Sequence, residues 1–177
     1  MKYIKALIAV IALVLADQFT KHLASAFLKG SAQGKILVPG VFRLLYLENR
    51  GSAFGMMQNK IPFLLIFTIV VLAVVVYFYI RLPYTRRMLP LRLGAVFITA
   101  GALGNFIDRV FQGYVVDFFY FELINFPIFN VADIYVTVSA AALVLLILFH
   151  YKDEDFAAIS AKGKLRGGEN ERTDILR

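Results

Sequence analysis

Three aspartates follow one another through the apolar second half of the chain, at Asp108, Asp117 and Asp133. A charged side chain in the middle of a bilayer costs roughly 2.5 to 3.5 kcal/mol on insertion scales, so an unpaired acid there usually marks a site or a pathway. Asp108 is followed directly by Arg109, whereas neither Asp117 nor Asp133 has a lysine or arginine within four residues in the sequence. We therefore take Asp117 and Asp133 as the pair of carboxylates most suited to chemistry.

Two neighbouring carboxyl groups do not ionise together easily, because each negative charge disfavours the other. The ionised member of such a pair can activate a water molecule, while the protonated member polarises a carbonyl group, which is the chemistry of an aspartic protease. A transporter that carries protons or cations on intramembrane carboxylates is the alternative, and a purely structural membrane subunit is a third. The chain contains no cysteine and only two histidines, which argues against a metal centre.

Other polar residues have structural explanations that compete with functional ones. Asp17 and Lys21 are four residues apart, so on a helix they share one face and can form an ion pair that holds helices together. We expect replacement of Lys21 to reduce stability rather than to affect chemistry directly. Asn105 and Asn130 suit hydrogen bonds between membrane helices, and Arg109 suits an anchoring position at the membrane interface.

The composition is that of a polytopic membrane protein, with 60% hydrophobic residues among 177. The net charge is +7, and the cations flank apolar runs, where they contact the head groups of anionic membrane lipids. A nucleic-acid-binding surface would gather its cations on one face instead, so nucleic acid is not an expected partner.

The clearest membrane span is residues 61–80, which are uncharged and lie between Lys60 and Arg81. Further spans are predicted at about residues 92–110 and 131–150, and Gly94, Gly101 and Gly104 permit close packing of helices there. The first apolar run could be a cleavable signal peptide ending near residues 24–26, but its helix-compatible continuation favours a span at about residues 3–28. The predicted fold class is therefore an all-α membrane protein with four transmembrane helices.

The distribution of arginine predicts the orientation of these spans. The connection after the second span holds four arginines, whereas residues 112–130 hold no lysine or arginine, so we place the arginine-rich loop and both termini in the cytoplasm. Residues 35–58 alternate in hydrophobicity and are predicted to form short strands outside. Helical rise then puts Asp108 and Asp133 at one level, about 24 to 25 Å from the cytoplasmic ends of their spans and near the outer interface. Residues 151–177 read as a polar cytoplasmic tail.

Five short motifs occur in order along residues 3–150: DQFTK, ENRGSAFG, GNFIDR, VVDF and FNVAD. Together they resemble the lipoprotein signal peptidases, also called signal peptidase II. The resemblance implies a four-helix aspartyl peptidase of the bacterial inner membrane, with an outer β-cradle over residues of the segment 35–58 and its active site near the outer leaflet. Its implied substrates are diacylglyceryl-modified prolipoproteins, cleaved just before the lipidated cysteine, and its implied inhibitors are of the globomycin type. It implies no cofactor.

Matching each motif to this chain assigns the functional residues that the resemblance implies. The catalytic acids fall on Asp117 in VVDF and Asp133 in FNVAD. The supporting or substrate-binding residues are Asp17, Lys21, Asn49, Gly51, Asn105, Asp108, Arg109 and Asn130. Residues 1–150 would then form the membrane peptidase domain. Because the family retains its first span, the resemblance also favours a retained helix over a cleaved signal peptide.

Overall fold

The computed structural model describes residues 2–51, 60–152 and 154–155. Four helices, α1 (Lys2–Leu28), α2 (Ile61–Arg81), α3 (Leu89–Gln112) and α4 (Val131–Phe149), carry segments long and apolar enough to cross a membrane. The predicted fold class, four spans with a small sheet, is therefore confirmed. Helix α3 is longer at both ends than the predicted range of residues 92–110.

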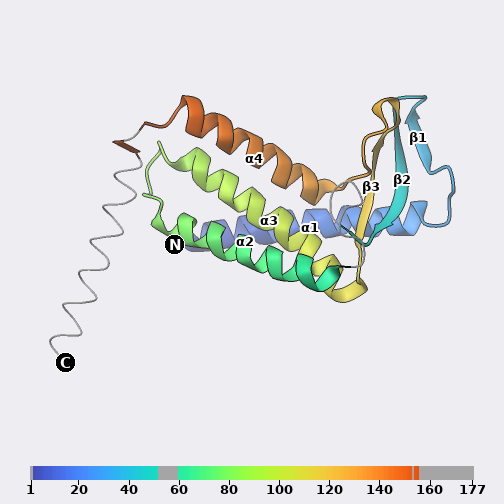
Figure 1. Ribbon diagram of the computed structural model, residues 1–177, viewed down its shortest axis with the longest axis horizontal. Helices are drawn as coiled ribbons and strands as arrows, with labels where there is room; N and C mark the ends of the chain where they lie inside the picture. The colour runs from blue at the N-terminus through green and yellow to red at the C-terminus, as the bar shows by residue number, and fades with distance from the viewer. Residues whose placement is uncertain (1, 52–59, 153, 156–177) are drawn as a thin grey trace.

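Helix α3 lies at the centre of the bundle and packs against each of the other three helices. Successive helices run in opposite directions, and the sheet lies at the end of the bundle opposite the N-terminus and the α2–α3 connection (Figure 1). The parts of the helices that face the sheet therefore lie closest to the strands.

Local sequence explains where the helices begin and end. Prolines lie in the first turns of α2 and α3, where a missing N–H is tolerated. Helix α3 ends at Gly113, whose φ of 73° is left-handed and favours glycine, so that the chain can turn back into the sheet. Helix α4 begins at a capping box, in which the Asn130 side chain accepts from the Asp133 N–H and the Asp133 side chain accepts from the Asn130 N–H.

The sheet has three antiparallel strands in the order β1 (Lys35–Val38), β2 (Phe42–Asn49) and β3 (Val115–Phe121). Strands β1 and β2 lie within the predicted segment 35–58, of which residues 52–59 are outside the described part of the chain. Strand β3 is an element that the sequence did not predict. Its register pairs Leu47 with Asp117 and Asn49 with Val115, which brings Asn49 beside the acid of VVDF.

Two clusters of buried apolar side chains fix the ends of the bundle. Near the sheet, Ala24 and Leu28 of α1 pack against Val116 and Phe118 of β3. At the opposite end, Tyr151 packs with three residues of the α2–α3 region, Leu82, Met88 and Leu91.

The beginning of the predicted polar tail is attached to the bundle through Arg87. The Tyr151 hydroxyl donates to the Arg87 carbonyl oxygen at 2.8 Å, and the Arg87 guanidinium donates to both carboxylate oxygens of Asp155 at 2.6 Å. These contacts tie the described residues after α4 to the α2–α3 connection.

Glycines on α3 allow the other helices to approach closely, as predicted. A Cβ atom at Gly101 would collide with the backbone oxygen of Ala132 at the start of α4, and one at Gly104 would collide with the Asp17 carboxylate. The nearest atoms to a Cβ atom at Gly94 would belong to the side chain of Leu143, the closest at 2.8 Å. Backbone atoms of α4 cannot move aside without displacing the helix, whereas a leucine side chain can change rotamer.

We predict that Gly101→Ala destabilises the protein by about 1 to 3 kcal/mol, because the added methyl group forces α4 away from α3. Gly94→Ala, the same change on the same helix, serves as the control and should cost clearly less. Thermal unfolding of both variants in one detergent checks this. Equal losses of stability would show that the α3–α4 contact does not depend on Gly101.

Candidate active site

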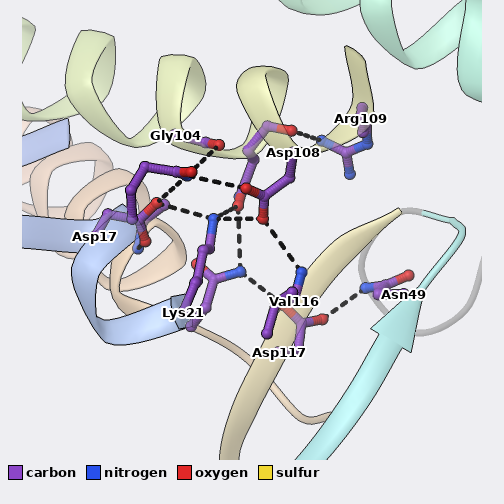
Figure 2. A network of polar contacts seen from close by, with 12 residues as sticks. Asp17, Lys21, Asn49, Gly104, Asp108, Arg109, Val116 and Asp117 are labelled. Atoms are coloured by element: carbon purple, nitrogen blue, oxygen red, sulfur yellow. Dashed lines mark hydrogen bonds and ion pairs between the residues drawn. The ribbon is translucent and has the colours of Figure 1, made fainter. Parts of the chain in front are cut away.

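Polar side chains from α1, α3, α4, β2 and β3 converge where the bundle meets the sheet, and Figure 2 shows much of this network. Asp17, Lys21, Asp108, Asp117 and Asn130 each have 3% or less of their surface exposed. Burial of polar and charged groups is costly unless they are paired or hydrogen-bonded, so the partners of each group decide what the cluster can do.

The Lys21 ammonium lies between two carboxylates. Its Nζ atom is 2.9 Å from Asp17 Oδ2 and 3.0 Å from Asp108 Oδ2, and it donates to Asn105 Oδ1 at 2.9 Å. The predicted Asp17–Lys21 ion pair is therefore present, and Asp108 is a second ionic partner that the sequence spacing did not reveal. Because an ammonium group has three N–H donors, these three acceptors use its full capacity.

The two acids that contact Lys21 also accept backbone N–H groups, Asp17 from helix α4 and Asp108 from strand β3. Asp17 Oδ1 accepts from the Ala132 N–H of α4 at 2.9 Å, and Asp108 Oδ2 accepts from the Val116 N–H of β3 at 3.2 Å. Gln18, which was not among the predicted site residues, donates to Asp108 Oδ1 at 2.9 Å and to the Gly104 carbonyl at 3.2 Å. Its signals in the sequence were its position directly after Asp17 and its place in the motif DQFTK.

The Asp117 carboxylate accepts one amide hydrogen bond on each oxygen. Asn130 Nδ2 donates to Oδ1 at 2.6 Å, and Asn49 Nδ2 donates to Oδ2 at 2.8 Å. The acid therefore lies between the sheet and the start of α4, and Figure 2 shows Asn49 reaching it from β2.

The Asp133 carboxylate is held in the same way. Asn105 Nδ2 donates to its Oδ1 at 2.7 Å, and the Asn130 N–H donates to its Oδ2 at 3.1 Å. Asn130 thus contacts both acids, one through its side chain and the other through its backbone. The structure brings Asp117 and Asp133 into one hydrogen-bonded group.

Each of the three asparagine amides has its orientation fixed by what its oxygen accepts. Asn49 Oδ1 accepts from the Gly51 N–H at 2.9 Å, Asn130 Oδ1 from the Asp133 N–H at 3.0 Å, and Asn105 Oδ1 from Lys21. Since the oxygen side of each amide faces a donor, the nitrogen side faces a carboxylate. All four oxygens of the two acids therefore accept an N–H group.

The surroundings of Asp117 favour its protonated form. The pKa of the Asp117 carboxyl group is raised from 3.8 to about 7. Burial is the largest cause of the rise, and repulsion by Asp133 adds to it. The hydrogen bonds from Asn49 and Asn130 oppose the rise. A group with this pKa can hold or release a proton near neutral pH, as a general acid or base must.

Arg109 lies beside the acids rather than serving only as an interfacial anchor. Its guanidinium donates to the Gly51 carbonyl at 3.1 Å and to the Asn105 carbonyl at 3.4 Å. These contacts connect the end of β2 to the turn of α3 that carries Asn105. All eight supporting residues named from the sequence, together with Asp117 and Asp133, thus lie in one connected cluster.

A family model described as signal peptidase (SPase) II matches residues 9–149. The chain belongs to the signal peptidase II family. A lipoprotein signal peptidase of Streptococcus thermophilus (strain CNRZ 1066) is 41% identical over 148 residues, covering 84% of this chain and 93% of that protein. Another, from Caldanaerobacter subterraneus subsp. tengcongensis, is 43% identical over 151 residues, covering 81% of this chain and 96% of that protein.

A solved bacterial membrane enzyme, determined by the in meso method at 2.3 Å, has the same fold. It superposes with a TM-score of 0.74 at 32% identity, covering 84% of this chain and 92% of that chain. The resemblance inferred from the five motifs is thereby confirmed, and membership in the signal peptidase II family makes this chain a membrane protease.

We predict that Lys21→Met lowers the free energy of unfolding by about 3 to 5 kcal/mol, because it leaves the buried Asp17 and Asp108 carboxylates without their shared counter-charge. Lys29→Met is the matched control, since Lys29 is 56% exposed and pairs with Glu48 at the surface. Thermal unfolding in detergent compares the two variants. A Lys21→Met protein as stable as the Lys29→Met protein would contradict the structural role of this ammonium.

Proposed function

We propose that this protein is an aspartyl endopeptidase that removes the signal peptide from diacylglyceryl-modified bacterial prolipoproteins, cutting just before the lipidated cysteine. The observation that carries the proposal is that Asp117, which is buried, and Asp133 lie in one hydrogen-bonded cluster, with all four carboxylate oxygens oriented by N–H donors. The names of the related lipoprotein signal peptidases supply the substrate class.

In the proposed reaction the two acids hold one proton between them and flank a water molecule. The ionised carboxylate takes a proton from the water as the water oxygen attacks the scissile carbonyl carbon. The protonated carboxyl group gives its proton to the carbonyl oxygen. Collapse of the resulting diol breaks the C–N bond, and the leaving nitrogen receives a proton from the pair. The raised pKa of Asp117 supports a shared proton near neutral pH; the pair titrates as a unit, so neither acid is given a fixed role.

The three asparagines have a defined part in this scheme. Neutral N–H donors hold both carboxylates in place without supplying a proton that would compete with the shared one. Asn105 connects this arrangement to Lys21, and Asn130 connects the two acids to each other. Asp17 and Asp108 act through Lys21 and the backbone of β3 and α4, and they therefore serve as positioning residues.

The proposed location follows from charge and from the fold. The end of the bundle that holds the α2–α3 connection carries Arg81, Arg86, Arg87 and Arg92, which fits the cytoplasmic side of the bacterial inner membrane. Both termini would then be cytoplasmic, and the sheet with the acid cluster would face the outer leaflet. Globomycin-type inhibitors would be expected to bind over the acids.

We predict that Asp117→Asn and Asp133→Asn each reduce cleavage of a lipid-modified prolipoprotein at least about 100-fold, because the pair can no longer both accept and donate a proton. Asp155→Asn, the same change at the far end of the bundle, is the control and should leave the rate unchanged. Cleavage is scored by gel shift with purified protein, using lipidated and unlipidated substrate. Parental rates in either site variant would refute the assignment of the acids.

We also predict that kcat/KM declines as the pH rises through about 7, where the Asp117 carboxyl group loses its proton. The rate falls as the pH rises because the pKa of Asp117 is raised: the pair holds its proton below about pH 7 and loses it above that pH. The rate should fall about tenfold for each pH unit well above the pKa, since only the protonated pair reacts. A rate that stays constant or rises between pH 7 and 9, with the protein still folded, would contradict the shared proton.

A further inference from the structure

A hollow between α1 and α2, with α3 as its floor, lies outside the acid cluster. Its volume is about 530 Å³, within the range of roughly 300 to 1,000 Å³ usual for small-molecule sites, and it is partly open at the surface. The lining is almost entirely apolar and includes Leu7 and Val10 of α1, Val76 and Ile80 of α2, and Val96 and Leu103 of α3. None of the acids or asparagines of the candidate active site contributes to it.

The hollow occupies the half of the bundle remote from the sheet. On α1 its lining extends from Tyr3 to Val10, and on α3 from Ala95 to Leu103, which corresponds to roughly 10 to 12 Å along the helix axes. The N-terminus marks this end of the bundle in Figure 1. The lining therefore extends along the direction in which lipid chains run beside a membrane helix.

A buried arginine stands at the polar end of the hollow. Arg92 is only 5% exposed, and its guanidinium donates to the hydroxyl of Tyr79, a lining residue, at 2.8 Å. The guanidinium carbon also lies 4.6 Å from the centre of the Tyr79 ring and 4.2 Å from that of Tyr84. Among the residues that the structure describes, no carboxylate forms an ion pair with Arg92.

This arrangement lacks an anion. Burying a charge is expensive unless a counter-charge accompanies it, and a tyrosine hydroxyl with two aromatic rings provides only part of that compensation. Other cations flank the lining on the two remaining helices, with Lys5 next to Ala6 and Arg81 next to Ile80. Asp155, an acid at this end, is already held by Arg87.

We propose that the hollow binds an acyl chain of an anionic phospholipid, with the phosphate group of that lipid at Arg92. The apolar lining, which extends along the helices, accepts the chain, and the cations at its end accept the phosphate, so both parts of one molecule are matched. The proposal is independent of the proposed peptidase chemistry, because it shares no residue with the acid cluster.

The test uses the full-length protein purified in detergent and measures retained lipid by native mass spectrometry. Phosphatidylglycerol, phosphatidylcholine and diacylglycerol with identical chains are titrated separately, so that the anionic head group, the phosphate and the chains are distinguished. Phosphatidylglycerol should bind with the highest affinity and diacylglycerol with the lowest. Equal affinity for phosphatidylglycerol and diacylglycerol would overturn the proposal.

Two pairs of variants locate the site. Arg92→Gln should lower the affinity for phosphatidylglycerol about fivefold, the effect of one cation near an anionic lipid, whereas Arg86→Gln, at an exposed arginine of the same connection, should not. Val10→Phe fills the hollow and should lower the affinity for all three lipids, whereas Val74→Phe, on a surface of α2 that is 48% exposed, should not. If Arg92→Gln fails to fold, Val10→Phe alone shows whether the lipid binds in the hollow.

Other occupants would give different results, and each would overturn the proposal. A lipid-free dimer that Val10→Phe converts to monomer would assign the hollow to a second copy of the chain. Displacement of phosphatidylglycerol by a signal peptide would assign it to the substrate. Equal affinities for either variant and its control would show that the lipid binds elsewhere on the surface.

Discussion

Asn130 is the residue through which helix α4, strand β3 and both acids are held in one arrangement. Its side-chain oxygen caps α4 at the Asp133 N–H, its side-chain nitrogen donates to Asp117, and its backbone N–H donates to Asp133. Because the cap fixes which side of the amide faces the helix, the other side necessarily faces Asp117. The start of α4 therefore sets the geometry of the two carboxylates. When this end of the helix folds, it also positions the two acids.

The cost of burying charge explains why the rest of the cluster is so completely connected. Lys21 compensates Asp17 and Asp108, and these two acids in turn bind backbone N–H groups of α4 and β3. Close approach of α3 to α1 and α4 is possible because Gly101 and Gly104 have no side chains. Charge compensation and helix packing thus require each other: the glycines bring the helices near enough for the ion pairs to form, and the ion pairs make the buried charges tolerable.

The sequence predicted the features that depend on local pattern. Apolar length revealed the four spans, the i, i+4 spacing revealed the Asp17–Lys21 pair, and the five ordered motifs revealed the family. Strand β3 was not predicted, because VVDFFYF is an apolar run whose pairing with β2 is set by residues more than 60 positions away. The second ionic partner of Lys21 and the contact between Arg109 and Gly51 were not predicted for the same reason. Sequence spacing does not show which distant segments become neighbours.

The contacts of Tyr151 and Asp155 with Arg87 attach the described residues after α4 to the rest of the bundle. The ring of Tyr151 is part of the buried apolar cluster at this end, so the folded unit extends past the last residue of α4. Anyone engineering this protein should therefore leave Tyr151 and Asp155 in place. A truncation at the end of α4 would remove the Tyr151 ring from the buried cluster and leave Arg87 without the Asp155 carboxylate.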